Sequence, residues 1–292
     1  MAATGLRVVL ITTVAPVADA LAAALGDLGH ETVAVISARR GRPGPPSPWA
    51  ITDATAPRGL DVLFPRDRHS IEPLLRAYAP DLAICWGYPW RIPLAALEVP
   101  RLGSMNNHPA FLPRHRGPIP ISWAIREGDE SYGVTWHRMD AQLDTGPILA
   151  QASVPAREDE FDFETLGPRL LEAALEILPR ALERLAAGDP GDPQAPDGAT
   201  WAGHFDADYA AIDWSKPAPE IQRQVRAWSF AAGTERVPGP LATIGGRLVK
   251  VRRTSLTEPS GQGDAIRMET GDGPIWVVAW EPIEDPAETP AR

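Results

Sequence analysis

The order of apolar patterns in the first forty residues constrains the fold more than any other feature of the chain. Residues 6–12 (LRVVLIT) form a continuous apolar run, as expected for a parallel strand that is buried on both faces. Apolar residues then recur at helical spacing from Pro16 to Gly29, and residues 31–37 (ETVAVIS) read as a second strand. A strand–helix–strand start predicts the α/β class, with a doubly wound, mostly parallel sheet that binds ligands at the carboxyl ends of its strands.

No glycine-rich phosphate-binding motif follows the first strand of this Rossmann-like unit. Neither GxGxxG nor GxxxxGK[ST] is present there, so binding of a dinucleotide or of a P-loop nucleotide is poorly supported. The second strand instead leads into residues 38–49, which are rich in arginine, glycine and proline. This stretch is either a substrate-contacting loop or a solvated connection, and position alone favours the solvated connection.

The charge balance and the single cysteine limit the classes of partner and the compartment. A formal net charge of −10 argues against a nucleic-acid surface spread over the whole protein, although a local basic patch is compatible with it. One cysteine, Cys85, excludes an intrachain disulfide and fits a reducing cytosol. No leader pattern and no apolar run long enough to cross a bilayer stands out. We therefore expect a cytoplasmic protein with no membrane partner, while its oligomeric state stays open.

An aromatic loop follows the strand expected at residues 81–86 (DLAICW). In GYPWRIP, which comes directly after this strand, Tyr88 and Trp90 offer flat faces for an aromatic heterocycle. The loop lies where a doubly wound sheet presents its ligands. Packing of both rings on the domain surface is the equal alternative.

Three polar side chains form the strongest candidate for a catalytic site. If residues 103–108 are extended, Asn106 and His108 project to the same face of the strand. An amide can stabilise an oxyanion and an imidazole can accept a proton from an amine. Asp144, in the loop AQLDTG, could orient the imidazole and raise its pKa toward neutrality, or could simply form a turn.

A metal site is a further possibility that the spacing disfavours. Its ligands would be His108, His137, Asp140 and Asp144. No compact HxxxH-like spacing supports such a site, so we expect no metal cofactor.

At this point the motifs resemble those of a family, the formyltransferases that use 10-formyltetrahydrofolate, of which methionyl-tRNA formyltransferase is typical. The shared pattern is Asn-x-His, then Leu-Pro-x-x-Arg-Gly, then Leu-Asp-Thr-Gly, which here spans residues 106–108, 112–117 and 143–146. Ala110 and Phe111 replace a common serine and leucine, but neither change removes a group assigned to the transfer. The resemblance extends to the first strand–helix–strand unit and to residues 212–230.

The resemblance implies a co-substrate site and a mechanism. The pteridine of 10-formyltetrahydrofolate would lie along two loops, and the implied contact residues are Trp86, Gly87, Tyr88, Trp90, Ile92, Asp140 and Leu143. A neutral amine would attack the formyl carbon directly, with Asn106 stabilising the oxyanion and His108, tuned by Asp144, moving the protons.

The acceptor amine is harder to predict from the sequence. Lys250, Arg252 and Arg253 cluster near the C-terminus, but three cations are few for binding a phosphate backbone. We therefore expect a small-molecule amine, such as an amino sugar, an amino acid or a natural-product intermediate, with methionyl-tRNA as the alternative. A formyl-folate hydrolase or a non-catalytic folate-binding protein is less favoured, and a formimino donor is not excluded.

The expected domain organisation follows from a long helix and a linker. Leucines at helical spacing predict a core-packed helix over residues 163–187, and the Gly-, Pro- and Asp-rich residues 188–200 read as a linker. We expect a catalytic domain over residues 1–204 and a small β-rich, OB-like subdomain over residues 205–292. The final nine residues, EDPAETPAR, are expected to be disordered.

Overall fold

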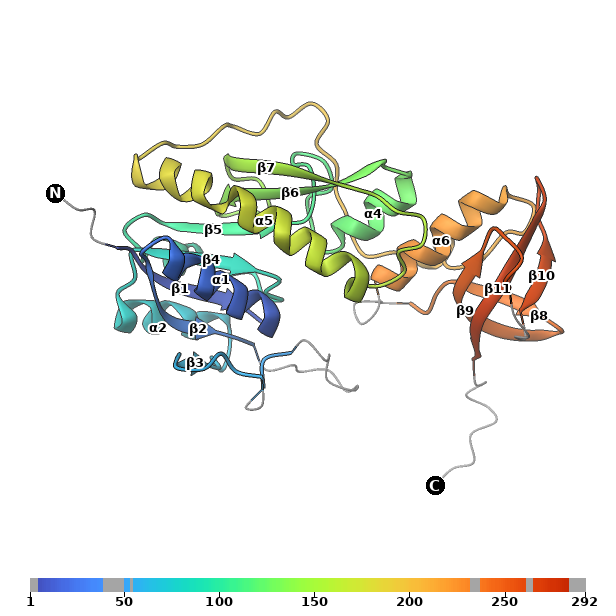
Figure 1. Ribbon diagram of the computed structural model, residues 1–292, viewed down its shortest axis with the longest axis horizontal. Coiled ribbons are helices and arrows are strands. Elements are labelled where there is room, and N and C mark those ends of the chain that lie inside the picture. The colour runs from blue at the N-terminus through green and yellow to red at the C-terminus, as the bar shows by residue number, and fades with distance from the viewer. Residues whose placement is uncertain (1–4, 39–49, 53–54, 232–236, 261–264, 284–292) are drawn as a thin grey trace, which may run out of the picture. The chain divides into compact units, whose positions relative to one another are not determined.

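A seven-stranded sheet forms the larger part of the fold (Figure 1). The computed structural model describes residues 5–38, 50–52, 55–231, 237–260 and 265–283. The strand order is β3-β2-β1-β4-β5-β6-β7, with parallel pairing from β3 to β5 and antiparallel pairing of β5 with β6. The strands are β1 (Arg7–Thr12), β2 (Glu31–Ile36), β3 (Val62–Leu63), β4 (Leu82–Trp86), β5 (Ser104–His108), β6 (Ser131–Arg138) and β7 (Ile148–Pro155).

The chain reverses its direction of travel across the sheet between β1 and β4. β1, β2 and β3 step toward one edge, and β4, β5, β6 and β7 then step toward the other. A reversal of this kind leaves a crevice outside the carboxyl ends of the strands, where open α/β sheets bind ligands. Asn106 and His108 stand at the carboxyl end of β5, which pairs with β4 and so lies one strand beyond this switch point.

Helices flank the strands of this sheet, as the sequence pattern requires. They are α1 (Ala15–Asp27), α2 (Ile71–Tyr78), α3 (Leu94–Leu97) and α5 (Phe163–Ala186), with a single 3-10 turn at Arg68–Ser70. α5 is tied to the sheet by Trp136, whose indole Nε1 donates to the carbonyl of Ala174 at 2.9 Å. The helix is predicted over 163–187, and the structure has it at nearly these bounds.

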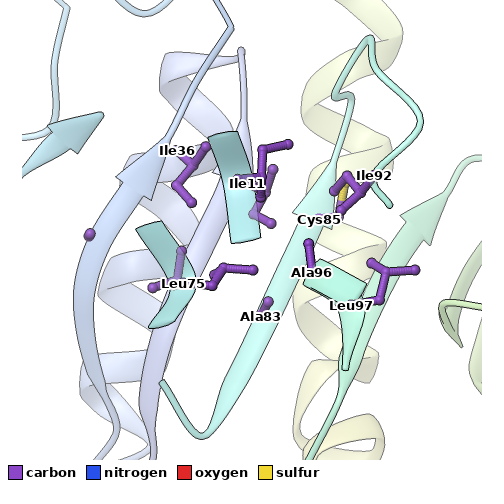
Figure 2. Close-up of a cluster of buried hydrophobic side chains, with 11 residues drawn as sticks. Ile11, Ile36, Leu75, Ala83, Cys85, Ile92, Ala96 and Leu97 are labelled. Atoms are coloured by element: carbon purple, nitrogen blue, oxygen red, sulfur yellow. The ribbon is translucent and has the colours of Figure 1, made fainter. Parts of the chain in front are cut away.

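One face of the sheet is covered by a continuous apolar cluster (Figure 2). Ile11, Ile36 and Ala83 contribute from three neighbouring strands, and Leu75 and Leu97 from α2 and α3. All five are nearly inaccessible to solvent. Burial of an isoleucine or leucine side chain stabilises a fold by about 1.5–3 kcal/mol. The cluster therefore holds β1, β2 and β4 in place, and β4 pairs with β5, which carries Asn106 and His108.

The C-terminal part contains a second, antiparallel sheet, in the order β10-β11-β9-β8. Its strands are β8 (Leu241–Ile244), β9 (Arg247–Ser255), β10 (Ile266–Glu269) and β11 (Pro274–Pro282), and the helices α4 (Pro120–Glu127) and α6 (Ala218–Phe230) and a 3-10 turn (Ala207–Tyr209) precede them. The core of this part brings Ile221 and Val225 of α6 together with Val249 and Ile275 of the sheet. The predicted α/β class with a small β-rich, OB-like C-terminal part is confirmed.

The chain divides into two compact units that are discontinuous in sequence. Unit 1 comprises Met1–Arg116, Gly133–Val154 and Arg169–Thr200, and unit 2 comprises Gly117–Tyr132, Pro155–Pro168 and Trp201–Arg292. The domain limits expected at residues 204 and 205 stay a prediction. The arginine-rich loop at residues 39–49 and the tail EDPAETPAR lie outside the described residues. Within the described ranges, no helix is long and apolar enough to span a membrane.

Candidate active site

The end of β5 places Asn106 and His108 on one face, as the alternation of side chains along a strand requires. Asn106 is in register with Cys85 of β4 and with His137 of β6. The Asn106 side-chain Nδ2 lies 3.2 Å from His137 Nε2. Because β5 and β6 are antiparallel, residues paired in this way lie side by side, so β6 contributes an imidazole to the site.

Asp144 is brought to the same place by the loop between β6 and β7. Its Oδ1 lies 3.6 Å from His108 Nδ1 and 3.5 Å from His137 Nε2. Its backbone has φ +57°, in the left-handed region that residues other than glycine rarely adopt. The structure thus brings Asn106, His108 and Asp144 together around a fourth residue, His137, while their catalytic roles stay a prediction.

Backbone carbonyls fix which nitrogen of each imidazole carries a proton. His108 Nε2 lies 2.8 Å from the carbonyl of His115, and His137 Nδ1 lies 2.8 Å from that of Arg138. A carbonyl oxygen only accepts, so both of these nitrogens donate. In the neutral rings, His108 Nδ1 and His137 Nε2 are therefore the basic nitrogens, and both face Asp144.

Burial dominates the acid–base state of His108. Its side chain is only 5% exposed, and this burial is the largest influence and lowers the pKa below the ordinary 6.5. The charge of Asp144 and the hydrogen bond to His115 act in the opposite direction but do not prevail. The expectation that Asp144 raises the His108 pKa is confirmed for the contribution of Asp144 itself, but burial outweighs it and the net pKa is lowered. A lowered pKa keeps the ring neutral, and ready to accept a proton, at pH 7.

His137 is the functional candidate that the sequence reasoning missed, because it entered only as a metal ligand. Its side chain is 2% exposed and it contacts both Asn106 and Asp144. Since His137 Nε2 accepts from the Asn106 amide nitrogen, it sets the orientation of that amide. The alternation of side chains along Thr135, Trp136 and His137 could have placed His137 on one face of β6. Its position beside Asn106 depends on the register between β5 and β6, which the local sequence does not give.

The two loops expected to hold the pteridine lie next to each other. Arg91 Nη2 donates to the carbonyl of Ala141, which links the loop after β4 to the loop after β6. The carboxylate of Asp140 accepts from the backbone of Gln142 at 2.9 Å and from Thr145 Oγ1 at 2.7 Å. Asp140 therefore shapes its own loop, which leaves the backbone and Leu143, 46% exposed, to meet a ligand.

The aromatic residues of the first loop are partly buried. Tyr88 and Trp90 pack against the apolar cluster of Figure 2 and meet edge to face, with ring centroids 5.7 Å apart. Trp86 meets Trp136 in the same geometry at 5.8 Å. This packing favours the interpretation in which the rings support the loop. Ile92, which is buried, anchors the far end of the loop, and Gly87 has φ +63°.

Loops of this composition fit a folate. A pteridine is a flat heterocycle with several donors and acceptors, and strand-end loops supply backbone N–H and C=O groups beside apolar side chains. Trp86 and Leu143 provide apolar surface there, and Asp144 places a carboxylate beside the two imidazoles.

Comparison with known proteins gives a consistent family. A family model described as formyl transferase matches residues 8–182. The chain is 35% identical over 277 residues to a methionyl-tRNA formyltransferase of Ruegeria pomeroyi, covering 90% of this chain and 87% of that protein. It is 36% identical over 280 residues to a protein of the same name from Pseudomonas fluorescens, covering 92% of this chain and 84% of that protein.

Solved structures with the same fold are more distant in sequence. HypX from Aquifex aeolicus, in complex with tetrahydrofolic acid, matches with a TM-score of 0.67 at 20% identity and covers 96% of this chain and 44% of that one. WlaRD, a sugar 3N-formyl transferase, matches with a TM-score of 0.63 at 18% identity and covers 94% of this chain and 97% of that one. At these identities the likeness concerns the fold.

Proposed function

Because the chain belongs to the formyltransferase family, we propose that it transfers the formyl group of 10-formyltetrahydrofolate to the amino group of methionyl-tRNA. The observation that carries the proposed chemistry is the grouping of Asn106, His108, His137 and Asp144 at the carboxyl end of β5. The acceptor is argued from the two relatives that are 35% and 36% identical over most of their length and are named for methionyl-tRNA.

In the proposed mechanism a neutral amine attacks the formyl carbon, and the bond from that carbon to the folate nitrogen breaks. The Asn106 amide has two N–H groups, and one is directed to His137 Nε2. The other donates to the oxygen that gains negative charge in the transition state. The amide is already oriented before the substrate binds, which is the condition for such a donor to lower the barrier.

His108 moves the protons. Its Nδ1 takes the proton that the attacking amine loses, because Nε2 already donates to the His115 carbonyl. Asp144, 3.6 Å away, stabilises the imidazolium that forms. The same proton then passes to the folate nitrogen that leaves, so that the site returns to its starting state without a covalent intermediate.

A small-molecule amine, the acceptor expected from the sequence, is not confirmed and stays the second candidate. The observation that favours it is the pairing of cations in the C-terminal sheet, where Arg252 binds Glu281 and Arg267 binds Glu269. Because the formal net charge is −10 and these arginines are paired with glutamates, this sheet offers little positive charge to attract a phosphate backbone. The relatives outweigh this argument, because the similarity to two proteins named methionyl-tRNA formyltransferase extends over about nine tenths of the chain.

An acceptor panel tests the proposal. The purified protein is incubated with 10-formyltetrahydrofolate and methionyl-tRNA, a nucleotide-linked amino sugar or free methionine, and formylated products are identified by mass spectrometry. We expect formylmethionyl-tRNA at a rate at least tenfold above that of any small amine. Transfer only to a small amine would establish the second candidate. Release of formate at the same rate with and without acceptors would mean hydrolysis and would exclude both.

A further inference from the structure

The segment that reads as a linker, residues 188–200, is held along unit 1 by pairs of hydrogen bonds. Asp192 and Ile148 exchange backbone hydrogen bonds of 2.8 Å each. At the other end, the backbone N–H of His115 donates to Thr200 Oγ1 at 2.8 Å, and the backbone N–H of Arg116 donates to the Thr200 carbonyl at 3.0 Å. We call residues 188–200 the strap, because hydrogen bonds join it to the start of β7 and to the loop after β5.

Gln194, in the middle of the strap, uses its whole side-chain amide. Nε2 donates to the carbonyls of Asp144 at 2.8 Å and Gly146 at 2.7 Å. Oε1 accepts from Arg116 Nε at 2.9 Å and Nη2 at 2.7 Å. A guanidinium only donates and a carbonyl only accepts, so the amide has one possible orientation.

The backbone that Gln194 holds is the strained backbone of the site. Asp144 has φ +57°, and a left-handed conformation of a residue other than glycine persists where the surroundings determine it. The two carbonyls that Gln194 binds belong to Asp144 itself and to Gly146, so the bonds hold the backbone at Asp144 and just after it. A Cβ on Gly146 would lie 1.9 Å from the carbonyl of Arg138, so the loop has no room to shift on that side.

We propose that Gln194 is a positioning residue for formyl transfer: its two donated hydrogen bonds hold the Asp144 loop so that the carboxylate faces His108 and His137. The inference rests on the proposed role of Asp144. It assigns to the strap a function in the reaction, with Arg116 of the Leu-Pro-x-x-Arg-Gly loop fixing the amide from the opposite side.

Anchoring of the strap is a separate task that other residues carry out. Arg184 binds Asp189 and Asp192, with Nε to Oδ2 of Asp189 at 2.6 Å and Nη1 to Oδ2 of Asp192 at 2.9 Å. These contacts and the Asp192–Ile148 pair remain when the Gln194 side chain is changed. Asp192→Asn is therefore a matched control, because it loosens the strap two residues away without touching the bonds to Asp144 and Gly146.

Two substitutions separate the bonds that Gln194 donates to the Asp144 loop from the bonds that it accepts from Arg116. Gln194→Glu keeps the length of the side chain and its contact with Arg116 but removes both donated bonds, whereas Gln194→Met removes all four. We expect each to lower kcat about ten- to a hundredfold, since small misplacements of a catalytic group cost that much. KM for the folate and for the acceptor should change less than about threefold, because the loss is confined to the transition state. Asp192→Asn should keep wild-type kcat.

A double-mutant cycle tests whether Gln194 acts through Asp144. In an Asp144→Ala background, Gln194→Met should have no further effect on kcat, because the carboxylate that it positions is gone. Equal effects of Gln194→Met in both backgrounds would overturn the proposal. Near-normal kcat in Gln194→Glu would also overturn it, and would leave the amide as an anchor for Arg116.

A measurement that needs no turnover keeps this inference distinct from the proposed function. NMR titration of the His108 imidazole should give a lower pKa in Gln194→Met than in the wild type, because a displaced carboxylate no longer favours the imidazolium. Asp192→Asn should leave the titration unchanged. If the wild type formylates no acceptor, the proposed function fails. The positioning role of Gln194 is rejected separately, by a His108 pKa in Gln194→Met that equals the wild-type value.

Discussion

At the scale of single residues, the account depends on where protons sit. Two imidazoles donate to backbone carbonyls and turn their basic nitrogens toward Asp144. Burial keeps His108 neutral, so it is prepared to accept the proton of the attacking amine. The arrangement explains why the amide and the imidazole of β5 and the carboxylate of the loop after β6 must act as a unit.

Loss of either Asn106 or Asp144 should lower turnover without unfolding the protein. Asn106→Ala removes the oxyanion donor, and loss of one such donor costs about a hundred- to a thousandfold in kcat. Asp144→Ala leaves the imidazolium without its counter-charge and should cost at least about a hundredfold. Steady-state kinetics measure the loss, with circular dichroism as the check on folding. A tenfold loss or less in both variants would contradict the roles assigned to these two groups.

The lowered pKa of His108 predicts the pH dependence. The ring must be neutral to act as a base, so kcat should hold as the pH falls to the ordinary imidazole value of 6.5 and should drop only below it. Asp144→Asn removes a charge that raises this pKa, so its acidic limb should move to lower pH. Both profiles are recorded with the same acceptor, so that titration of the acceptor amine is common to them. A limb that moves to higher pH in Asp144→Asn contradicts the assignment.

At the scale of elements, the sequence predicts those features of strands and helices that depend on the local pattern of residues. Asn106 and His108 share a face because residues two apart in a strand do, and β5 is extended as expected. The partnership of His137 with Asn106 depends on the register between β5 and β6, which no local pattern encodes. The helices α4 and α6 and the strand β10 were not predicted, and the role of the strap is visible only through its distant contacts.

The residue between the two catalytic candidates on β5 presents a stability test. Asn107 is 2% exposed and stands in register with Trp86 and Trp136. Neither its Nδ2 nor its Oδ1 has a hydrogen-bond partner among the described residues. A buried polar group without a partner costs about 1–3 kcal/mol.

Asn107→Val should therefore raise the free energy of unfolding, by about 1–3 kcal/mol, because it replaces the amide with an apolar side chain suited to a strand. Urea unfolding measures the change, and Asn107→Asp, which buries a charge, should move it in the opposite direction. A Val variant that is less stable than the wild type would mean that the amide makes a hydrogen bond in solution.

At the scale of the whole molecule, the question is which acceptor the charge distribution can serve. The net charge is −10, and Arg252 of β9 is paired with Glu281 of β11. Arg253 lies over the ring of Phe161, with its guanidinium carbon 5.2 Å from the ring centroid. These contacts make the basic cluster a solvated face of the second sheet, held by its own neighbours.

The basic cluster on β9 should therefore contribute little to the binding of methionyl-tRNA. Changing Lys250 and Arg252 together to alanine should alter KM for the tRNA less than about threefold and leave its salt dependence unchanged, since a phosphate contact that is lost reduces the salt slope by about one unit. Steady-state assays at several salt concentrations provide both numbers. A tenfold rise in KM with a flatter salt slope would place the tRNA backbone on this sheet.

The central claim is that His108 transfers protons in a direct formyl transfer from 10-formyltetrahydrofolate. Its most direct test is the rate of formyl-acceptor formation in a single turnover, with His108→Ala compared with the wild type under saturating folate and acceptor. The account predicts stoichiometric product with the wild type and a rate at least about a hundredfold lower in a folded His108→Ala variant. Near-normal product formation by His108→Ala would contradict the account.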